Sequence, residues 1–388
     1  MARRGAVNIG IIGHGMMGRA HSYAYNSAAQ LFELDYEPTV SVIAGRDRER
    51  TSAAASSYGI PDSTTDWREL IERDEVEIVD ICTPPGTHAE MIEAAAGAGK
   101  AIICEKPLCV SYADGTRAIQ AVRDAGVLNA AGFNYRKLPA VALMNKMITA
   151  GRVGEVINFR ASWLSDEFLD PSIPFDWRFQ RTLGGTTISD LGSHLIDLAT
   201  WMVGSIEEVV AQSSTITKQR PDSSSGRMIE VDVDDASSAL ASFKSGARGV
   251  FEMSRVSARH PCDFTIEVNG TRGSLRFDYP RLNELWFGDS TTDDSLSGMQ
   301  LIRAEHHTHP FAAQWWPIGQ GVGYDASFIN QAATLLQTWP DGPWAPDLET
   351  ALEVQAVCEA MARSAEEHRW VPISERCDWN TPTSFGTS

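Results

Sequence analysis

Cysteine and positive charge are both scarce in this sequence of 388 residues. The six cysteines are scattered without C-x-x-C spacing, and this pattern fits reduced, mostly buried thiols in a cytoplasmic protein. Lysine and arginine number 33 against 51 aspartates and glutamates, which gives a formal net charge of −18. That charge argues against binding to nucleic acid or to an anionic membrane surface.

Long apolar runs are also missing. No stretch approaches the roughly 20 apolar residues that span a bilayer. Arg3 and Arg4 are followed directly by an expected strand rather than by the apolar segment of a secretory signal, so we expect none. The length allows two domains of ordinary size, each with its own core.

The strongest local signal is a glycine fingerprint at residues 13–18, between an expected strand at 7–12 and an expected helix at 16–32. In this setting Gly13 makes a tight turn, Gly15 lets the backbone approach a pyrophosphate, and Gly18 allows close helix–strand packing. The free N–H groups at the start of the helix would bind the phosphates. The residues predicted here to contact a dinucleotide are Gly13, His14, Gly15, Met16 and Met17.

Strands and helices alternate through residues 1–135, the predicted dinucleotide-binding domain. Further strands are expected at 39–44, 76–82, 101–104 and 128–132, and helices at 48–58, 66–73, 87–98 and 112–125. This βαβ rhythm predicts an α/β fold, a doubly wound parallel Rossmann sheet with helices on both faces. Ligands of such sheets lie beyond the carboxyl ends of the strands. The residues there that we expect to contact the cofactor are Thr83, Pro84, His88, Glu105, Lys106 and Asn134.

The end of the second strand bears on cofactor choice. An acid usually stands there and holds the ribose 2′-hydroxyl of NAD, but this chain has Gly45, followed by Arg46 and Asp47. Gly45 with Arg46 suits the 2′-phosphate of NADP. Asp47 could still reach a ribose and favour NAD, and Arg46 could instead be a solvated loop residue. We expect all three near the cofactor, which is NAD(P) with NADP slightly favoured.

The pattern changes after about residue 135. Residues 156–163 alternate apolar and polar side chains, which is typical of a half-buried strand. Hairpins are expected at 236–255 and 263–278, helices at 139–150, 324–337 and 348–366, and exposed loops at 221–226 and 290–297. Residues 136–388 are therefore predicted to form an α+β domain with a large, mainly antiparallel open sheet that binds substrate. Its free face could pair with a second copy, giving a homodimer or homotetramer. The last helix is expected to pack back on the first domain.

Asp190 and His194 are the main chemical candidates in the second half. They are four residues apart at the expected start of a helix and so share one face. A histidine in the first turn feels the positive end of the helix dipole, which keeps its ring neutral and able to accept a proton. Alternatively, Asp190 is an N-cap and His194 a core histidine.

These motifs together resemble a known family. The glycine fingerprint, Glu105-Lys106-Pro107 and the pair of Asp190 and His194, in this order, resemble the Gfo/Idh/MocA oxidoreductases over nearly the whole chain. Some segments resemble members that oxidise C3 of pyranosides, namely 133–136, 176–180, 283–285, 316–318 and 321–324. The resemblance implies that Lys106 lies beside the nicotinamide and the reacting hydroxyl, and that Asp190 and His194 bind and deprotonate that hydroxyl. It also implies that Tyr135, Arg178 and Tyr324 line this pocket, the last two also touching the cofactor.

The predicted activity is transfer of a hydride between NAD(P) and a secondary hydroxyl or ketone of a sugar, anhydro-sugar, glycoside or cyclitol. His194 would take the proton, Asp190 would orient the ring or a sugar hydroxyl, and Lys106 would stabilise the developing alkoxide. One alternative is a redox-neutral lyase or glycosidase that oxidises its substrate transiently with a tightly bound cofactor. Another is a non-catalytic cofactor-binding regulator, which the intact catalytic residues disfavour.

Aromatic and histidine side chains supply the remaining candidates. Trp163, Trp177, Trp315 and Trp316 suit stacking on a sugar ring but could equally be core. Histidines at 306, 307 and 309 could bind a transition metal, yet no carboxylate or thiolate stands at structural spacing. We therefore expect a substrate-facing loop and no metal. The predicted substrate contacts are Lys106, Tyr135, Trp163, Arg178, Asp190, His194 and His309.

Overall fold

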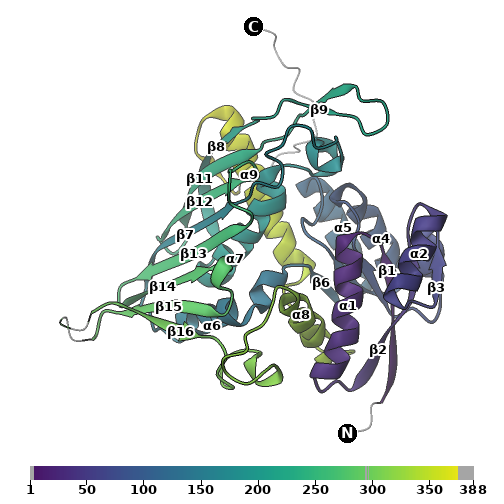
Figure 1. The fold of residues 1–388 in the computed structure, drawn as a ribbon, viewed down its shortest axis with the longest axis horizontal. Coiled ribbons are helices and arrows are strands. Elements are labelled where there is room, and N and C mark those ends of the chain that lie inside the picture. The colour runs from purple at the N-terminus through teal and green to yellow at the C-terminus, as the bar shows by residue number, and fades with distance from the viewer. Residues whose placement is uncertain (1–3, 293–294, 296, 375–388) are drawn as a thin grey trace.

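A computed structural model describes residues 4–292, 295 and 297–374 of the chain. Figure 1 shows a Rossmann layer and a large open sheet side by side, with helices between them. In the described part of the chain, no helix combines the length and apolar composition of a membrane span. The cysteines in this part are free thiols, as expected, and Cys377 lies outside the described residues.

The Rossmann layer is a parallel sheet with the strand order β3-β2-β1-β4-β5-β6. Its strands are β1 (Gly5–Ile12), β2 (Tyr36–Ala44), β3 (Asp62–Thr64), β4 (Ile78–Ile81), β5 (Ala101–Cys104) and β6 (Asn129–Ala131). Its helices are α1 (Met16–Leu31), α2 (Arg48–Tyr58), α3 (Trp67–Glu72), α4 (His88–Gly97) and α5 (Tyr112–Ala125). The central strands β4 and β5 are buried along their whole length and, apart from Asp80 in β4, apolar, because helices cover both faces of the sheet. The doubly wound α/β prediction is confirmed, although the three-residue strand β3 was missed.

The second sheet has the order β16-β15-β14-β13-β7-β12-β11-β8-β17. Its strands are β7 (Val156–Leu164), β8 (Ile206–Ser214), β11 (Ala236–Phe243), β12 (Arg248–Ser254), β13 (Asp263–Gly270), β14 (Gly273–Asp278), β15 (Glu284–Asp289), β16 (Met299–Arg303) and β17 (Val371–Pro372). Neighbours pair antiparallel except β7 and β12, which are parallel. The predicted open, mainly antiparallel sheet is confirmed, including both hairpins.

Four helices of the second half lie between the two sheets: α6 (Pro139–Thr149), α7 (Ser193–Val203), α8 (Asp325–Gln337) and α9 (Leu348–Glu367). Helices α6, α7 and α9 bury apolar residues against one face of the second sheet, and α8 packs against α1 (Figure 1). The other face of the sheet keeps Ile157, Leu240 and Val250 exposed.

Helix α9 holds the two halves together. The Leu348 N–H donates to Asn129 Oδ1 at 2.8 Å, and the Arg123 Nε to Glu349 Oε1 distance is 2.6 Å. These contacts join the helix to the edge of the Rossmann layer, while its buried face packs on β8. The predicted domain boundary between residues 135 and 136 precedes α6 and stays a prediction.

Several short strands were not predicted. The 221–226 loop is the turn between β9 (Gln219–Pro221) and β10 (Met228–Glu230), which pair antiparallel. The predicted 290–297 loop lies partly outside the described residues. The missed strands β8, β15 and β16 lack a clean period of two. The sheet is therefore wider than the sequence pattern indicated.

Candidate active site

An ion pair joins the two halves of the chain at the carboxyl ends of the Rossmann strands, where ligands of such sheets bind in a crevice. Lys106 follows Glu105 just after β5, and its Nζ lies 2.8 Å from Asp190 Oδ1 and 3.1 Å from the Asp190 carbonyl oxygen. The two side chains are 15% and 22% exposed, so both are still reachable from the crevice. The structure thus brings together two charged residues that lie 84 positions apart in sequence.

The helix that carries Asp190 begins earlier than predicted. The Thr187 N–H donates to Asp234 Oδ1 at 2.9 Å, and the Thr187 hydroxyl donates to the Asp234 carbonyl at 2.6 Å. Residues Ile188–Gly192 then form a π-helical turn that runs directly into α7. Asp190 is therefore not an N-cap, and His194 is not in the first helical turn. Such π-turns are frequent at functional sites.

His194 is 5% exposed and surrounded by aromatic rings. Its ring stacks on Trp163 with a centroid distance of 5.5 Å and meets the edge of Tyr135 at 4.7 Å. Burial lowers the pKa of His194 well below its usual value, and the Lys106 cation lowers it further against the smaller opposing effect of Asp190. The expected cause, the helix dipole, was wrong, because the helix starts elsewhere.

The ion pair fixes the charges of both its members. Burial opposes the charged form of Asp190, but Lys106, with smaller contributions from Arg178 and Arg255, lowers the pKa of Asp190 to about 2. Burial likewise opposes the Lys106 cation, and Asp190 outweighs it, so the pKa of Lys106 is raised. At neutral pH the crevice therefore presents a cation, an anion and a neutral imidazole.

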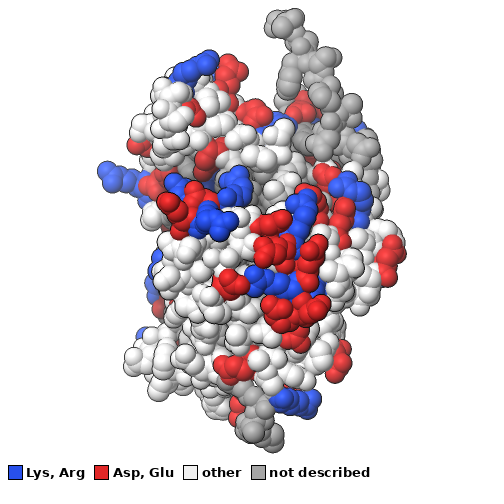
Figure 2. Space-filling view, turned by 90° about the vertical axis from the view of Figure 1, so that its right-hand side faces the viewer, with Lys and Arg blue, Asp and Glu red and all other residues white. Residues whose placement is uncertain are grey.

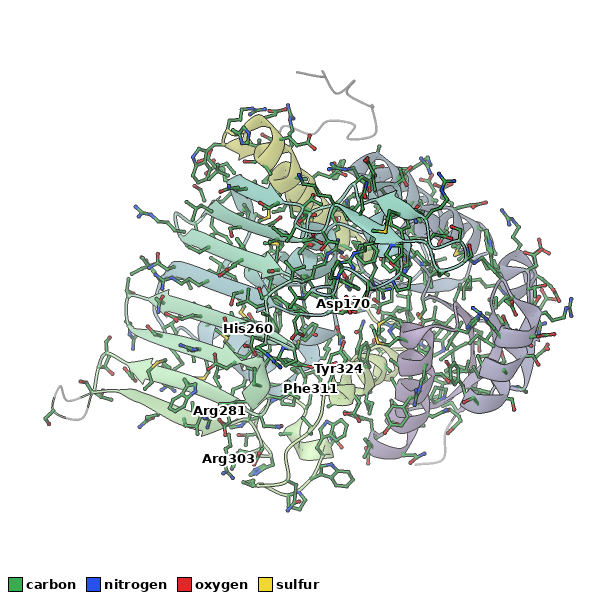
Figure 3. The ribbon with its side chains drawn as sticks, turned by 45° about the horizontal axis from the view of Figure 1, so that its top comes forward. Asp170, His260, Arg281, Arg303, Phe311 and Tyr324 are labelled. Carbon is green, nitrogen blue, oxygen red and sulfur yellow. The ribbon has the colours of Figure 1, made fainter. Side chains whose placement is uncertain are left out.

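Three predicted pocket residues cluster beside this group. Tyr135 is 4% exposed and lies 5.9 Å, between ring centroids, from Tyr324 at the start of α8. Asn134 Nδ2 donates to Ser327 Oγ at 2.7 Å, which ties the end of β6 to α8. In Figure 3, Tyr324 lies between the second sheet and the Rossmann helices. Trp163 is 8% exposed and stacks on His194, so its ring does not present an open face on which a sugar could stack.

Arg178 lies at the edge of the crevice. Its guanidinium stacks on Trp177 at 4.6 Å and pairs with Asp176 at 3.3 Å, and its charge reaches Asp190. The buried Arg255, which sequence reasoning missed, donates from Nη1 to the carbonyls of Arg178 and Gly185, both at 3.0 Å. Arg255 therefore holds the segment that leads into the π-turn, although it follows β12 without any motif around it.

Glu167 was also missed. Glu167 is exposed, but the packing around its carboxyl raises its pKa, and the neighbouring Asp190 charge raises it further, while Arg178 and Arg255 oppose this. An acid close to Asp190 is a second group able to hydrogen-bond a polyol. Nothing in its local sequence distinguishes it from a surface glutamate.

The glycine fingerprint has the geometry of a phosphate cradle. Gly13 has φ of 109°, and a Cβ on Gly18 would lie 1.9 Å from the Gly13 carbonyl oxygen, so both positions need glycine. A Cβ at Gly15 would meet nothing within 4 Å, and no side chain caps α1 there. Met16 is 71% exposed. The open backbone N–H groups at the start of α1 therefore fit a pyrophosphate.

The His14 ring packs directly against Gly45, the residue after β2. A Cβ on Gly45 would lie 2.3 Å from the His14 ring, so the glycine makes room for that side chain. Asp47 Oδ1 accepts a hydrogen bond from the Arg50 N–H at 2.9 Å and caps α2. Arg46 is exposed.

His88 is fully buried and holds two loops together. Its Nε2 lies 2.7 Å from the Thr83 carbonyl oxygen, and its Nδ1 lies 3.0 Å from the Leu108 carbonyl oxygen. Thr83 itself accepts a hydrogen bond from Thr87 at 2.7 Å, and Pro84 is half-buried beside it. His88 thus positions the loops after β4 and β5 from behind the crevice.

Two predicted groups lie elsewhere. Trp315 and Trp316 line a separate cavity of about 420 Å³ between α1 and α8, with Tyr23. His309 is half-buried, and burial, with the charges of His306 and Lys146, lowers its pKa. None of the groups that shift it belongs to the Lys106 crevice, so the structure does not bring His309 beside Asp190.

Comparison with known proteins identifies the family. The model of the oxidoreductase family with an NAD-binding Rossmann fold matches residues 7–133, and the Gfo/Idh/MocA C-terminal domain model matches residues 141–276. Levoglucosan dehydrogenase of Pseudarthrobacter phenanthrenivorans is 34% identical, over 95% of this chain and 98% of its own. The chain belongs to the Gfo/Idh/MocA oxidoreductases.

Other relatives agree with this assignment. The inositol 2-dehydrogenase of Rhizobium meliloti is 26% identical over 95% of this chain and 99% of its own. A crystal structure of an oxidoreductase domain protein from Kribbella flavida is 38% identical, with a TM-score of 0.92 over 95% of this chain and 99% of that one. Levoglucosan dehydrogenase in complex with NADH and L-sorbose, 35% identical with the same coverage, also has a TM-score of 0.92. This Gfo/Idh/MocA chain is thus an NAD-binding oxidoreductase.

His194 predicts a measurable dependence of stability on pH. Its pKa is lower in the folded than in the unfolded chain, where it is about 6.5, so below that pH the unfolded chain binds more protons. The free energy of unfolding should therefore fall as pH decreases from 7.5 to 5, by up to about 1.4 kcal/mol per pH unit from this residue. His194→Gln should show a shallower fall in denaturant titrations across this range. Equal slopes in the two proteins would contradict the lowered pKa.

Proposed function

We propose that this enzyme transfers a hydride between NAD(P) and a secondary hydroxyl or ketone of a sugar, anhydro-sugar, glycoside or cyclitol, with C3 of a pyranoside-like ring favoured. The observation that carries the proposal is the neutral His194 beside the ion pair of Lys106 and Asp190 at the end of β5. Removal of hydride from an alcohol requires a proton acceptor and a cation near the developing alkoxide. This crevice supplies both.

The roles of the residues follow from their charges. His194, buried and neutral, accepts the hydroxyl proton. Lys106 is held as a cation by Asp190 and stabilises the negative charge that develops on the substrate oxygen. Asp190, with its second oxygen free of Lys106, orients a substrate hydroxyl. The nicotinamide, when bound, supplies the hydride acceptor.

The binding residues extend this arrangement. The backbone of 13–18 would hold the pyrophosphate, and we assign Asn134, Tyr324 and Arg178 to the region where the cofactor would meet the substrate. Tyr135 fixes the ring of His194 and closes one side of the pocket. The substrate class rests on the relatives, which are levoglucosan and inositol dehydrogenases. A cytoplasmic location stays a prediction.

A substrate panel tests this reaction against its alternative. Purified enzyme would be mixed with NAD or NADP and with pyranoses, anhydro-sugars, glycosides and inositols, and absorbance at 340 nm recorded. Accumulation of reduced cofactor supports a dehydrogenase. Substrate loss without net reduction of added cofactor would instead support the redox-neutral lyase or glycosidase and contradict the proposal.

Lys106→Ala should lower kcat by at least about 10²-fold, because both the stabilising cation and the partner of Asp190 disappear. Lys100 provides a matched control, since it precedes the same strand and its Nζ bonds the carbonyls of Arg73 and Val76 at 2.8 and 2.7 Å. Lys100→Ala should lose thermal stability but retain kcat. A folded Lys106→Ala protein with near-normal kcat would remove Lys106 from the mechanism.

Cofactor choice depends on Arg46 in this proposal. Asp47 caps α2, and Gly45 stands where an acidic residue would otherwise repel a 2′-phosphate. The end of β2 therefore has no carboxylate placed to reject NADP. We expect measurable use of NADP, and Arg46→Ala should lower kcat/KM for NADP more than for NAD. Arg68→Ala, which changes an exposed arginine paired with Glu90, is the control. Equal losses with the two cofactors would show that Arg46 does not recognise the phosphate.

The exposed sheet face supports self-association. Leu240 is 49% and Val250 41% exposed, and the two lie opposite each other on β11 and β12. Packing of this sheet face against a second copy of the chain would give a homodimer or homotetramer. Light scattering should find an oligomer that a double Leu240→Lys, Val250→Lys variant dissociates, whereas Ile216→Lys, at another exposed apolar residue, should not. A monomeric wild-type protein at micromolar concentration would contradict this.

A further inference from the structure

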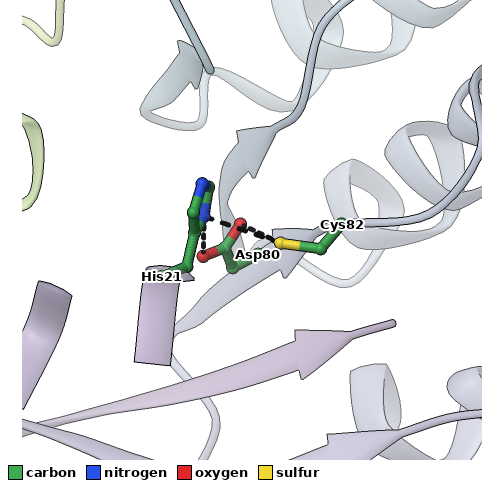
Figure 4. A group of neighbouring side chains, drawn as sticks. All are labelled: His21, Asp80 and Cys82. Carbon is green, nitrogen blue, oxygen red and sulfur yellow. Dashed lines mark hydrogen bonds and ion pairs between the residues drawn. The ribbon is translucent and has the colours of Figure 1, made fainter. Parts of the chain in front are cut away.

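A buried charge network lies directly behind the catalytic lysine. His21 of α1 places Nδ1 at 2.8 Å from Asp80 Oδ2 and Nε2 at 3.0 Å from Glu105 Oε1. The side chains of His21, Asp80 and Glu105 are 6%, 0% and 5% exposed. Figure 4 shows the His21 ring beside Asp80 and Cys82 at the end of β4. Both ring nitrogens of one histidine thus face carboxylate oxygens.

The hydrogen bonds of Asp80 and Glu105 favour a doubly protonated His21 ring. Asp80 also faces the Tyr25 hydroxyl at 2.7 Å and the Cys82 thiol at 3.5 Å, both of which donate to it. Glu105 Oε2 accepts the Lys106 backbone N–H at 3.1 Å. An ionised carboxylate can only accept hydrogen bonds, and a neutral imidazole could donate to only one of the two. An imidazolium satisfies both.

A metal ion is the competing explanation, because His21, Asp80 and Cys82 bring three ligand atoms within 4.8 Å of one another. Ligands about 2.0–2.1 Å from a tetrahedral zinc lie roughly 3.3 Å apart. The Nδ1 to Oδ2 distance of 2.8 Å is shorter than that and is typical of a charged hydrogen bond. In addition, Glu105 sits on the other nitrogen, away from such an ion. The distances favour a proton over a metal.

The network is connected to the catalytic residue through Glu105. Gly132 leaves room for this side chain, because a Cβ there would lie 2.6 Å from Oε1, and Glu105 Oε2 accepts the hydrogen bond of the Lys106 N–H. Lys106 then reaches across the crevice to Asp190. A shift of Glu105 would move the backbone from which the catalytic amine extends.

We propose that His21 is a positioning residue: as an imidazolium bridging Asp80 and Glu105, it fixes Glu105 against the backbone of Lys106 and so places the catalytic amine. This inference rests on the proposed function, in which Lys106 acts on the substrate. The bridge also compensates two acids that would otherwise repel each other in a buried region.

The surrounding charges agree with this state. Burial would lower the pKa of His21, but Asp80 and the other neighbours outweigh it and raise that pKa well above its usual value. The titratable groups that face the ring are Asp80 and Cys82 from β4 and Glu105 after β5, while α8 contributes the ring of Phe328 at 5.7 Å. Because the folded pKa is raised, the bridge is present at and below neutral pH and is lost as pH rises through the raised value.

The direct test is ¹⁵N NMR of the whole enzyme labelled at its nine histidines. At pH 7.5, one ring should show both nitrogens protonated, and Asp80→Asn should shift that signal, which identifies His21. A neutral His21 ring at pH 7.5 would overturn the proposal. So would stoichiometric zinc bound to the purified protein, measured by elemental analysis. This spectroscopic result does not depend on activity, so it stays informative if Lys106 proves not to be catalytic.

Kinetics then separate positioning from mere stabilisation. His21→Gln keeps a polar side chain but loses the charge, and we expect kcat to fall at least about tenfold while the Kd for NADH changes less than about threefold. Tyr25→Phe is the matched control: it removes a buried hydrogen bond to the same Asp80 but leaves the bridge. It should lower Tm while kcat stays within about twofold. Equal kcat losses in the two variants, or an unchanged kcat in folded His21→Gln, would overturn the positioning role.

Discussion

The ion pair between Lys106 and Asp190 is the interaction on which the rest of the site depends. It joins the carboxyl end of a Rossmann strand to a π-helical turn of the second half, and each partner fixes the charge of the other. It also determines the state of His194, because a cation held nearby adds to burial in keeping that ring neutral. Without the pair, a buried lysine would tend to lose its proton and a buried aspartate to gain one.

The fold was largely predictable because its strongest signals are local. Apolar strands alternating with helices gave the Rossmann layer, and turn residues with a period of two gave the hairpins β11–β12 and β13–β14. Strand β8 escaped detection because two glutamates follow its first residue, and β3 because three residues carry no period. Strands such as these form because they pair with neighbours distant in sequence, and their own residues show no strand pattern.

Site residues that belong to a sequence motif could be predicted, whereas residues that reach the site only through contacts distant in sequence could not. Lys106 was singled out by its place after an expected strand, and Asp190 and His194 by their spacing, although the helix dipole was the wrong reason for a neutral His194. The register of the π-turn is set by Asp234, whose side chain fixes Thr187, 47 residues earlier in sequence. Arg255, His21 and Asp80 stand in ordinary strand and helix sequences. Only their burial and distances reveal that they hold the catalytic segments in place.

The arrangement of charge agrees with the proposal that His194 is the base. In a poorly solvated crevice an ionised group persists only beside an opposite charge. Lys106 has Asp190, and the buried Arg255 lies 3.4 Å from Asp235. His21 lies between two carboxylates. His194 is surrounded by rings instead, with the nearest cation disfavouring its protonation. In the proposed reaction, uptake of a proton by His194 is therefore favoured by the negative charge that would develop on the substrate oxygen, which would couple proton transfer to hydride transfer.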